Sequence, residues 1–271
     1  MKKTSPLIAA LLGAGLALGM NSTTALAAEE SPAPPKAEAA KPAAEKAAAE
    51  VPTAPLAPEV AEVLDKMDAI GKQFKTIRSR FDYELNQTLY EDIKKRKGEL
   101  YYQAPNHLRF EFTDKPQETF AFDGRTLFHK NDATRQLIIY ELRLPSEPPV
   151  DSLELGKTPF PLPFGQHKDA VLKHFGVSRD AKEEAADKEK RAVLILEPKK
   201  DTPLEKDYTK ILLWVDTKTW LPTRAKLYDT SKNETTVDFH HTESNKDTDA
   251  KLFERPDVPK DWEVVTHPKE K

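Results

Sequence analysis

Large apolar side chains occupy alternate positions between residues 98 and 140, the pattern of β-strands that bury one face. Seven of the 31 residues from 98 to 128 are aromatic, against 8% of the whole chain, so this face is rich in rings. Asp123-Gly124 supplies a hairpin turn before the next strand. The apolar residues at these alternate positions are Leu100, Tyr102, Leu108, Phe110, Phe112, Phe120 and Phe122. We therefore expect an antiparallel meander with an aromatic concave face.

The remaining pattern adds helices at two places and further strands. Apolar residues at helical spacing predict an amphipathic helix that Pro58-Glu59 opens and that ends near Gly71. Around 150–155 we expect a loop with a short helical turn, and at 166–175 a second helix. The charged run at 180–191 is typical of a solvated hairpin loop. Strands are expected at 81–85, 192–197, 211–216, 222–229 and 235–242, with a last one near 262–265.

The N-terminal 27 residues have the three parts of a secretory signal peptide. Lys2 and Lys3 precede an apolar stretch, and Ala25-Leu26-Ala27 forms a small-x-small cleavage site. The alternative, an uncleaved membrane anchor, fits less well, because the apolar stretch is shorter than the ~20 residues that span a bilayer. We expect an exported protein, located in the periplasm and cleaved near Ala27.

Residues 28–58 have a different composition, with twelve alanines and seven prolines in 31 positions. Such a segment buries too little apolar area to offset its ordering entropy, and its prolines favour an extended tether. It is either a spacer or a tolerated disordered leader. The 213 residues that follow, 59–271, are enough for one domain with a substantial core.

Charge and composition exclude several classes of function. The formal net charge is −3 with both signs interspersed, so nucleic-acid binding has little support. The chain has no cysteine, which excludes a thiol nucleophile, a disulfide and lipidation at a lipobox.

No constellation of catalytic or metal-binding residues stands out. His240 and His241 are neighbours on an expected strand and point to opposite faces, so they cannot face one metal ion together. Glu111, Asp114 and Glu118 are interpreted as outward-facing strand or turn charges. We therefore expect a protein that is not an enzyme, with no catalytic residues, no metal and no cofactor.

Several short motifs occur in the order found in one protein family. They are G-x-L-Y at Gly98, P-N-x-L-R-F-E at Pro105, D-G-x-T-L-F at Asp123 and T-P-F at Thr158, and later ILLWVDTKTWLPTRAKLYD at 211–229 and a final Phe253-x-x-Pro256. In this order the chain resembles the periplasmic outer-membrane lipoprotein carriers, the LolA-type family. The resemblance spans about residues 60–265. It implies an incomplete antiparallel β-barrel, or half-barrel, mainly β, closed by covering helices that form a lid.

The resemblance also implies a ligand site, a hydrophobic cavity for acyl chains. The residues that we expect to line it are Leu100, Tyr102, Leu108, Phe110, Phe112, Phe120, Phe122 and Phe128, with Leu213, Val215, Ile211 and Leu227 from the C-terminal half. The alternative is that these side chains simply fill a core beneath the helices.

One position departs from the family pattern. In the better-studied carriers the residue before Pro-Asn is an arginine that helps latch the lid, whereas here it is Ala104. Arg109 lies on the outward parity; it either latches the lid by another route or forms a surface ion pair.

Two functional hypotheses follow. The first is a monomeric periplasmic carrier of lipoprotein acyl chains or related lipids, which needs an inner-membrane donor and an outer-membrane acceptor. The second is an envelope lipid- or protein-sensing interaction module, similar to stress regulators, that does not transport.

Overall fold

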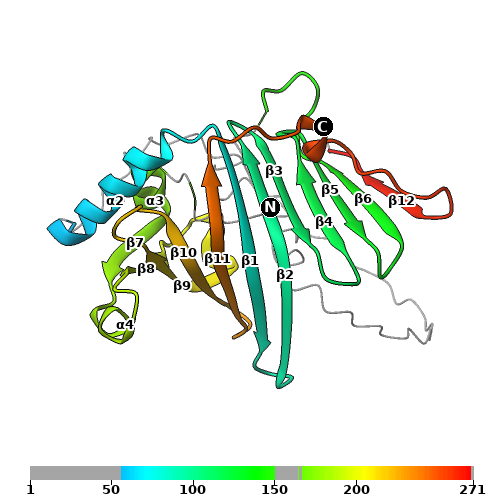
Figure 1. Cartoon of the computed structure of the whole chain (residues 1–271). Coiled ribbons are helices and arrows are strands. Elements are labelled where there is room, and N and C mark those ends of the chain that lie inside the picture. Colours follow the sequence, from blue (N-terminus) through cyan, green and yellow to red (C-terminus); the bar gives the residue numbers. More distant parts are fainter. Residues whose placement is uncertain (1–55, 150–163, 165–166, 270–271) are drawn as a thin grey trace, which may run out of the picture. The chain divides into compact units, whose positions relative to one another are not determined.

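The fold is described from a computed structural model that covers residues 56–149, 164 and 167–269. Within these residues one twelve-stranded sheet carries a few short helices (Figure 1). The first part of the chain forms α2 (Pro58–Gly71), β1 (Thr76–Gln87), β2 (Asp92–Gln103), β3 (His107–Phe112), β4 (Glu118–Phe122), β5 (Thr126–Asn131) and β6 (Gln136–Glu141). The later part forms α3 (Lys168–His174), β7 (Phe175–Arg179), α4 (Ala181–Ala186), β8 (Ala192–Pro198), η1 (Pro203–Lys206), β9 (Tyr208–Val215), β10 (Pro222–Asp229), β11 (Glu234–Ser244), η2 (Ala250–Phe253) and β12 (Glu263–His267).

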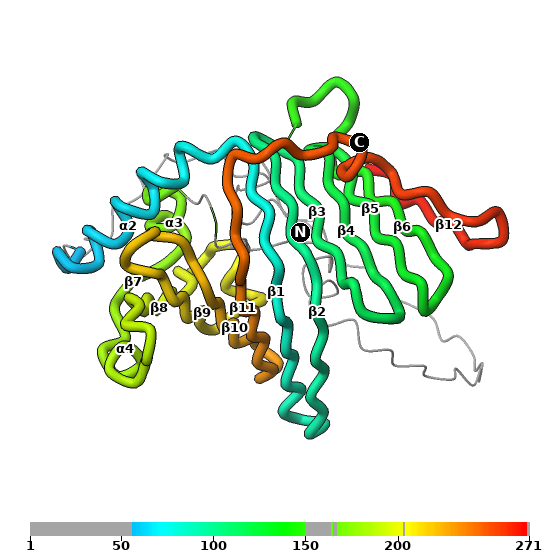
Figure 2. Tube along the Cα trace, in the orientation of Figure 1, coloured from blue at the N-terminus to red at the C-terminus, as the bar shows by residue number. Residues whose placement is uncertain are grey.

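The strand order is β12-β6-β5-β4-β3-β2-β1-β11-β10-β9-β8-β7, so the sheet is open at β12 and β7. Its neighbouring strands are antiparallel except β12, which runs parallel to β6. β1 lies between β2 and β11 and so joins the N-terminal and C-terminal strands into one sheet (Figure 2). The predicted fold class, a mainly β sheet that does not close into a barrel, is confirmed.

Two clusters of buried side chains lie on the same face of the sheet, which we call the inner face; the opposite one is the outer face. The aromatic cluster comprises Ile77, Phe81, Tyr83, Leu85, Leu100, Tyr102, Leu108, Phe110, Phe112, Phe120, Phe122, Leu127, Phe164, Val237 and Phe239. The helix-covered cluster comprises Val60, Val63, Leu64, Val171, Phe175, Ala192, Leu194, Leu196, Leu204, Tyr208, Ile211, Leu213, Val215, Ala225 and Leu227.

The predicted N-terminal helix is confirmed as α2, and its apolar stripe covers the second cluster. Val60, Val63 and Leu64 are its buried residues, at the spacing that places side chains on one helix face. α2 packs beside α3 and β7 at one end of the sheet (Figure 1). None of the helices in the described part of the chain is long and apolar enough to cross a bilayer.

Two local expectations need revision, and a third is not tested. The second helix ends at His174, and Phe175 begins β7 instead. The run 180–191 is not only a solvated loop: it contains α4, and Arg191 is buried against Asp187, which accepts hydrogen bonds from its guanidinium. The expected helical turn at 150–155 lies outside the described residues.

Gly98 on β2 makes room for a ring of the aromatic cluster. A Cβ at this position would overlap the Phe81 ring and the carbonyl oxygen of Glu111 on β3. Phe81 in turn stacks on Phe110, with ring centres 4.1 Å apart. The absence of a side chain at Gly98 therefore lets the Phe81 ring lie against β2.

We expect Gly98→Ala to lower the free energy of unfolding by about 1–3 kcal/mol, because the added methyl group must displace a packed ring or a neighbouring strand. Gly176→Ala on β7 is the matched control, since its nearest neighbour would be 3.9 Å from the new Cβ. Urea denaturation of both variants measures the difference. An unchanged or higher stability of Gly98→Ala would contradict this packing.

Candidate functional site

The aromatic cluster is one of the two buried apolar clusters of the inner face, and its rings contact one another. Phe81 and Phe112 meet edge to face at 5.5 Å between ring centres, and Tyr83 meets Phe112 at 5.4 Å. Phe164 packs on Phe239 from outside the sheet, at 4.8 Å. These edge-to-face and stacked arrangements are the favoured geometries of aromatic pairs. The cluster is thus a packed aromatic layer rather than a polar cleft.

The structure brings most of the predicted lining residues together. Seven of them belong to the aromatic cluster, each at most 7% exposed: Leu100, Tyr102, Leu108, Phe110, Phe112, Phe120 and Phe122. Ile211, Leu213, Val215 and Leu227 face the same side of the sheet but belong to the helix-covered cluster, with α2 above them. The lining residues therefore fall into two separate clusters.

Phe128 does not join them. Across the Asp123-Gly124 turn, Phe122 pairs with Leu127, and Ala121 pairs with Phe128. Residues paired directly across a ladder share a face, so Phe128 lies on the outer face with Ala121 and Leu137. Leu127 occupies the inner position that we assigned to Phe128.

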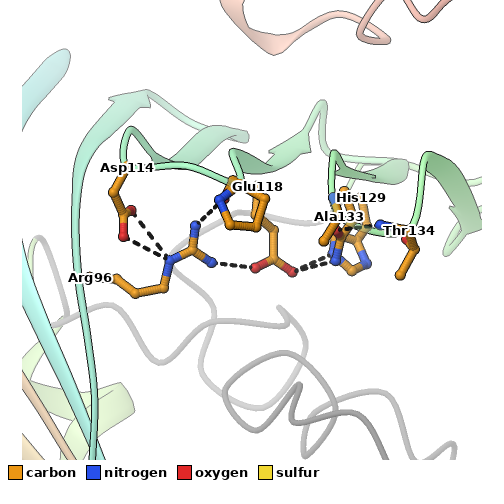
Figure 3. Close-up of polar contacts among 8 residues, drawn as sticks. Arg96, Asp114, Glu118, His129, Ala133 and Thr134 are labelled. Atoms are coloured by element: carbon orange, nitrogen blue, oxygen red, sulfur yellow. Dashed lines mark hydrogen bonds and ion pairs between the residues drawn. The ribbon is translucent and has the colours of Figure 1, made fainter. Parts of the chain in front are cut away.

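At one end of the aromatic cluster the inner face becomes polar. Figure 3 shows the contacts of Arg96, Asp114, Glu118 and His129 there. The polar cluster consists of Arg96, Asp114, Glu118, His129 and Asn131. Glu118 accepts hydrogen bonds from Arg96 Nη1 at 2.8 Å, from His129 Nε2 at 2.8 Å and from Asn131 Nδ2 at 3.4 Å. The Arg96 Nε lies 3.3 Å from both carboxylate oxygens of Asp114.

Glu118 corrects a prediction, because its side chain is only 11% exposed and does not face outward. Burial by itself would raise the pKa of Glu118, but the hydrogen bond from His129 and the charges of His129 and Arg96 outweigh it and hold the pKa below its ordinary value. The sequence did carry a signal: residues 118, 120 and 122 share one parity. Glu118 therefore belongs on the face of Phe120 and Phe122.

The family of the chain follows from a comparison with family models. The model described as outer membrane lipoprotein carrier protein LolA matches residues 72–256. The chain belongs to the LolA family. The match begins directly after α2 and ends beyond η2, so it contains β1 to β11, with both inner-face clusters apart from α2.

Solved structures similar to this LolA-family chain are distant. A protein from Thermus thermophilus described as uncharacterized is 12% identical, with 77% of this chain and 99% of that chain covered and a TM-score of 0.46. A LolA superfamily protein from Nitrosomonas europaea is 13% identical, with coverages of 72% and 97% and a TM-score of 0.37. Lipoprotein LppX from Mycobacterium tuberculosis is 8% identical, with coverages of 71% and 99% and a TM-score of 0.41. No curated protein matches the sequence.

Arg109, which we expected either to latch the lid or to form a surface ion pair, forms an ion pair with Glu111 and also holds a later segment of this LolA-family chain. Its side chain lies on the outer face, donates to Glu111 Oε2 at 2.8 Å and donates to the carbonyl oxygen of Leu252 at 3.1 Å. Leu252 belongs to η2, so these contacts fasten the segment after β11 to β3. Ala104, at the position of the family arginine, packs against the aromatic cluster.

A hollow of about 780 Å³ offers a second surface that the sequence did not indicate. Trp214 and Leu212 of the outer face line it, together with charged residues of both signs that include Arg96 and Asp114 of the polar cluster. Lys95 pairs with Glu84 at 2.9 Å, and charged side chains of this kind are costly to strip of water. The hollow is therefore more polar than the aromatic cluster.

Proposed function

We propose that this LolA-family chain binds the acyl chains of lipoproteins, or of related amphiphilic lipids, against its aromatic inner face and passes them towards the outer membrane. The observation that carries the proposal is the aromatic cluster, an apolar layer built from five neighbouring strands and β11. The proposed location is the periplasm. The proposed partners are an inner-membrane donor that loads the protein and an outer-membrane acceptor that unloads it.

The magnitudes indicate how such a carrier can release its cargo. Burying an acyl methylene is worth about 0.8 kcal/mol, so one chain of ordinary length represents roughly 10 kcal/mol. Three fully buried chains would exceed the practical affinity limit of about 18–21 kcal/mol. A carrier must therefore bury its cargo incompletely. Rings that pack on one another when the site is empty compete with the ligand, and this competition lowers the net affinity.

A second function is supported by the same packing. Each of the seven predicted lining residues of the aromatic cluster is already at most 7% exposed, as in the solid core of an interaction module. An envelope-sensing module would use such a core for stability and would bind a membrane-anchored protein without lipid. The two functions differ in whether lipid enters the inner face.

The experiment that tests transport is native mass spectrometry of the mature protein isolated from the periplasm, with lipid extraction of the same sample. We expect an acylated molecule in near-stoichiometric amount, or its uptake when a triacylated lipopeptide is added. A protein that is empty and also fails to take up the lipopeptide would contradict the carrier. A stable, lipid-free complex with a membrane-anchored regulator would favour the interaction module.

A further inference from the structure

The polar cluster is continuous with the aromatic cluster. Strand register places Glu118 opposite Phe112 and His129 opposite Phe120, so these pairs share the inner face. The His129 ring stacks on Phe120 with centres 4.2 Å apart. The guanidinium carbon of Arg96 lies 4.1 Å from the centre of the Phe112 ring. An amphiphile whose chain lies along the rings would therefore bring its polar end to these groups.

The polar cluster is more buried than a set of surface ion pairs. The side chains of Glu118, His129 and Arg96 are 11%, 14% and 21% exposed, whereas both partners of the surface pair Lys95–Glu84 are more than 40% exposed. Charged groups that lose water must be compensated by close partners, and a packed apolar pair would serve stability at least as well. A role in binding gives a reason for polar groups at this place.

The charges of the cluster indicate which polar end would fit. Arg96 contributes one positive charge, while Asp114 and Glu118 contribute two negative charges, so the carboxylates of the cluster outnumber its guanidinium. Carboxylates accept hydrogen bonds and have none to donate. An ammonium group supplies a positive charge and N–H donors for these carboxylates. A carboxylate or phosphate in the same place would face two like charges.

We propose that the polar cluster binds the polar end of the amphiphile whose chain lies on the aromatic cluster, and that it selects an ammonium group over an anionic group. This inference rests on the proposed function, because it needs a chain on the inner face. Glu118 is the central residue, since it joins Arg96 and His129 (Figure 3). It also accepts from Asn131. Asp114 adds the second carboxylate at the more exposed side of the cluster.

The test uses three probes with the same hexadecyl chain: the amine, the alcohol and the carboxylic acid. Binding of each to the full mature protein is measured by calorimetry at neutral pH. We expect the amine to bind at least tenfold more tightly than the acid, with the alcohol between them. We expect this ratio to fall several-fold in Glu118→Gln and in Asp114→Asn, each of which removes one negative charge. Glu141→Gln, on the exposed end of β6, removes the same charge elsewhere and should leave the ratio unchanged.

The amine-to-acid ratio is measured within each variant, so a smaller folded fraction affects both probes equally. Asp114→Asn provides a second variant if Glu118→Gln folds poorly. An amine-to-acid ratio near one in the natural sequence would overturn the inference while leaving the carrier intact. An equal fall of the ratio in Glu141→Gln and in Glu118→Gln would also overturn the inference. If none of the three probes binds and a triacylated lipopeptide does not bind either, the proposed function itself fails.

Two sources could supply the ammonium group, a lipid headgroup or the peptide part of a lipoprotein. Phosphatidylethanolamine compared with phosphatidylglycerol tests the first source. Triacylated lipopeptides that end in lysine or in glutamate test the second. The pair of ligands that shows the same preference for ammonium as the hexadecyl probes identifies the source. If neither the phospholipids nor the lipopeptides show this preference, the inference is overturned.

Discussion

Replacing Phe110 by alanine is expected to weaken lipid binding by tenfold or more, whereas replacing Phe128 by alanine leaves binding nearly unchanged. Both rings are 7% exposed, so both variants lose similar packing, about 3–5 kcal/mol of unfolding free energy. Only Phe110 belongs to the aromatic cluster; Phe128 lies on the outer face. The two substitutions therefore separate a loss of binding surface from a general loss of stability.

The measurement combines urea denaturation with binding of a triacylated lipopeptide by the folded fraction of each variant. If lipid binds at the inner face, the two variants lose similar stability, but only Phe110→Ala loses binding. If both variants lose binding in proportion to their stability, the inner face has no special role. If Phe128→Ala alone loses binding, the outer face is the site.

Replacing Leu64 by alanine is expected to loosen α2 and to speed the entry of lipid. Leu64 is 3% exposed in the helix-covered cluster, and truncation of such a residue costs about 2–5 kcal/mol. Because Leu64 of α2 shares a buried cluster with Leu213 and Val215, looser packing of α2 should leave these side chains uncovered more often. Hydrogen exchange should report faster opening of α2, and stopped-flow uptake of a fluorescent lipid should become faster.

Glu62→Ala provides the control, because Glu62 lies on the exposed side of the same helix. It should change neither hydrogen exchange nor lipid uptake appreciably. Faster exchange of α2 in Leu64→Ala without any change in uptake would show that α2 does not gate the site.

The alternation of apolar and polar residues was sufficient to predict the inner-face positions on β2, β3 and β4. A strand turns successive side chains to opposite faces, so parity alone assigns Leu100, Phe110 and Phe122. Parity fails at turns, because the register across a turn depends on the number of residues in it. Phe128 was misplaced for this reason, and Leu127 pairs with Phe122 instead.

Charged residues were harder to place than rings. Glu118 has the parity of its aromatic neighbours, but its charge indicated the outer face. Its inward position depends on Arg96 and His129, which are 22 and 11 residues away and reach it only through the pairing of β2 to β5. Arg191 is a similar case: its burial depends on Asp187 and on Thr223 of β10, whose hydroxyl accepts from Arg191 Nη1. Local patterns do not contain such distant partners.

The most direct test of lipid binding at the inner face is site-specific photo-crosslinking from two adjacent residues of β6. Tyr140 packs against the aromatic cluster and Ile139 against the outer-face group of Phe128, and both are partly exposed. A photoreactive phenylalanine derivative at either position therefore requires no buried space. With bound lipopeptide, the account predicts a crosslink from position 140 and little or none from position 139. A crosslink mainly from position 139, or none from either while lipopeptide is bound, would contradict it.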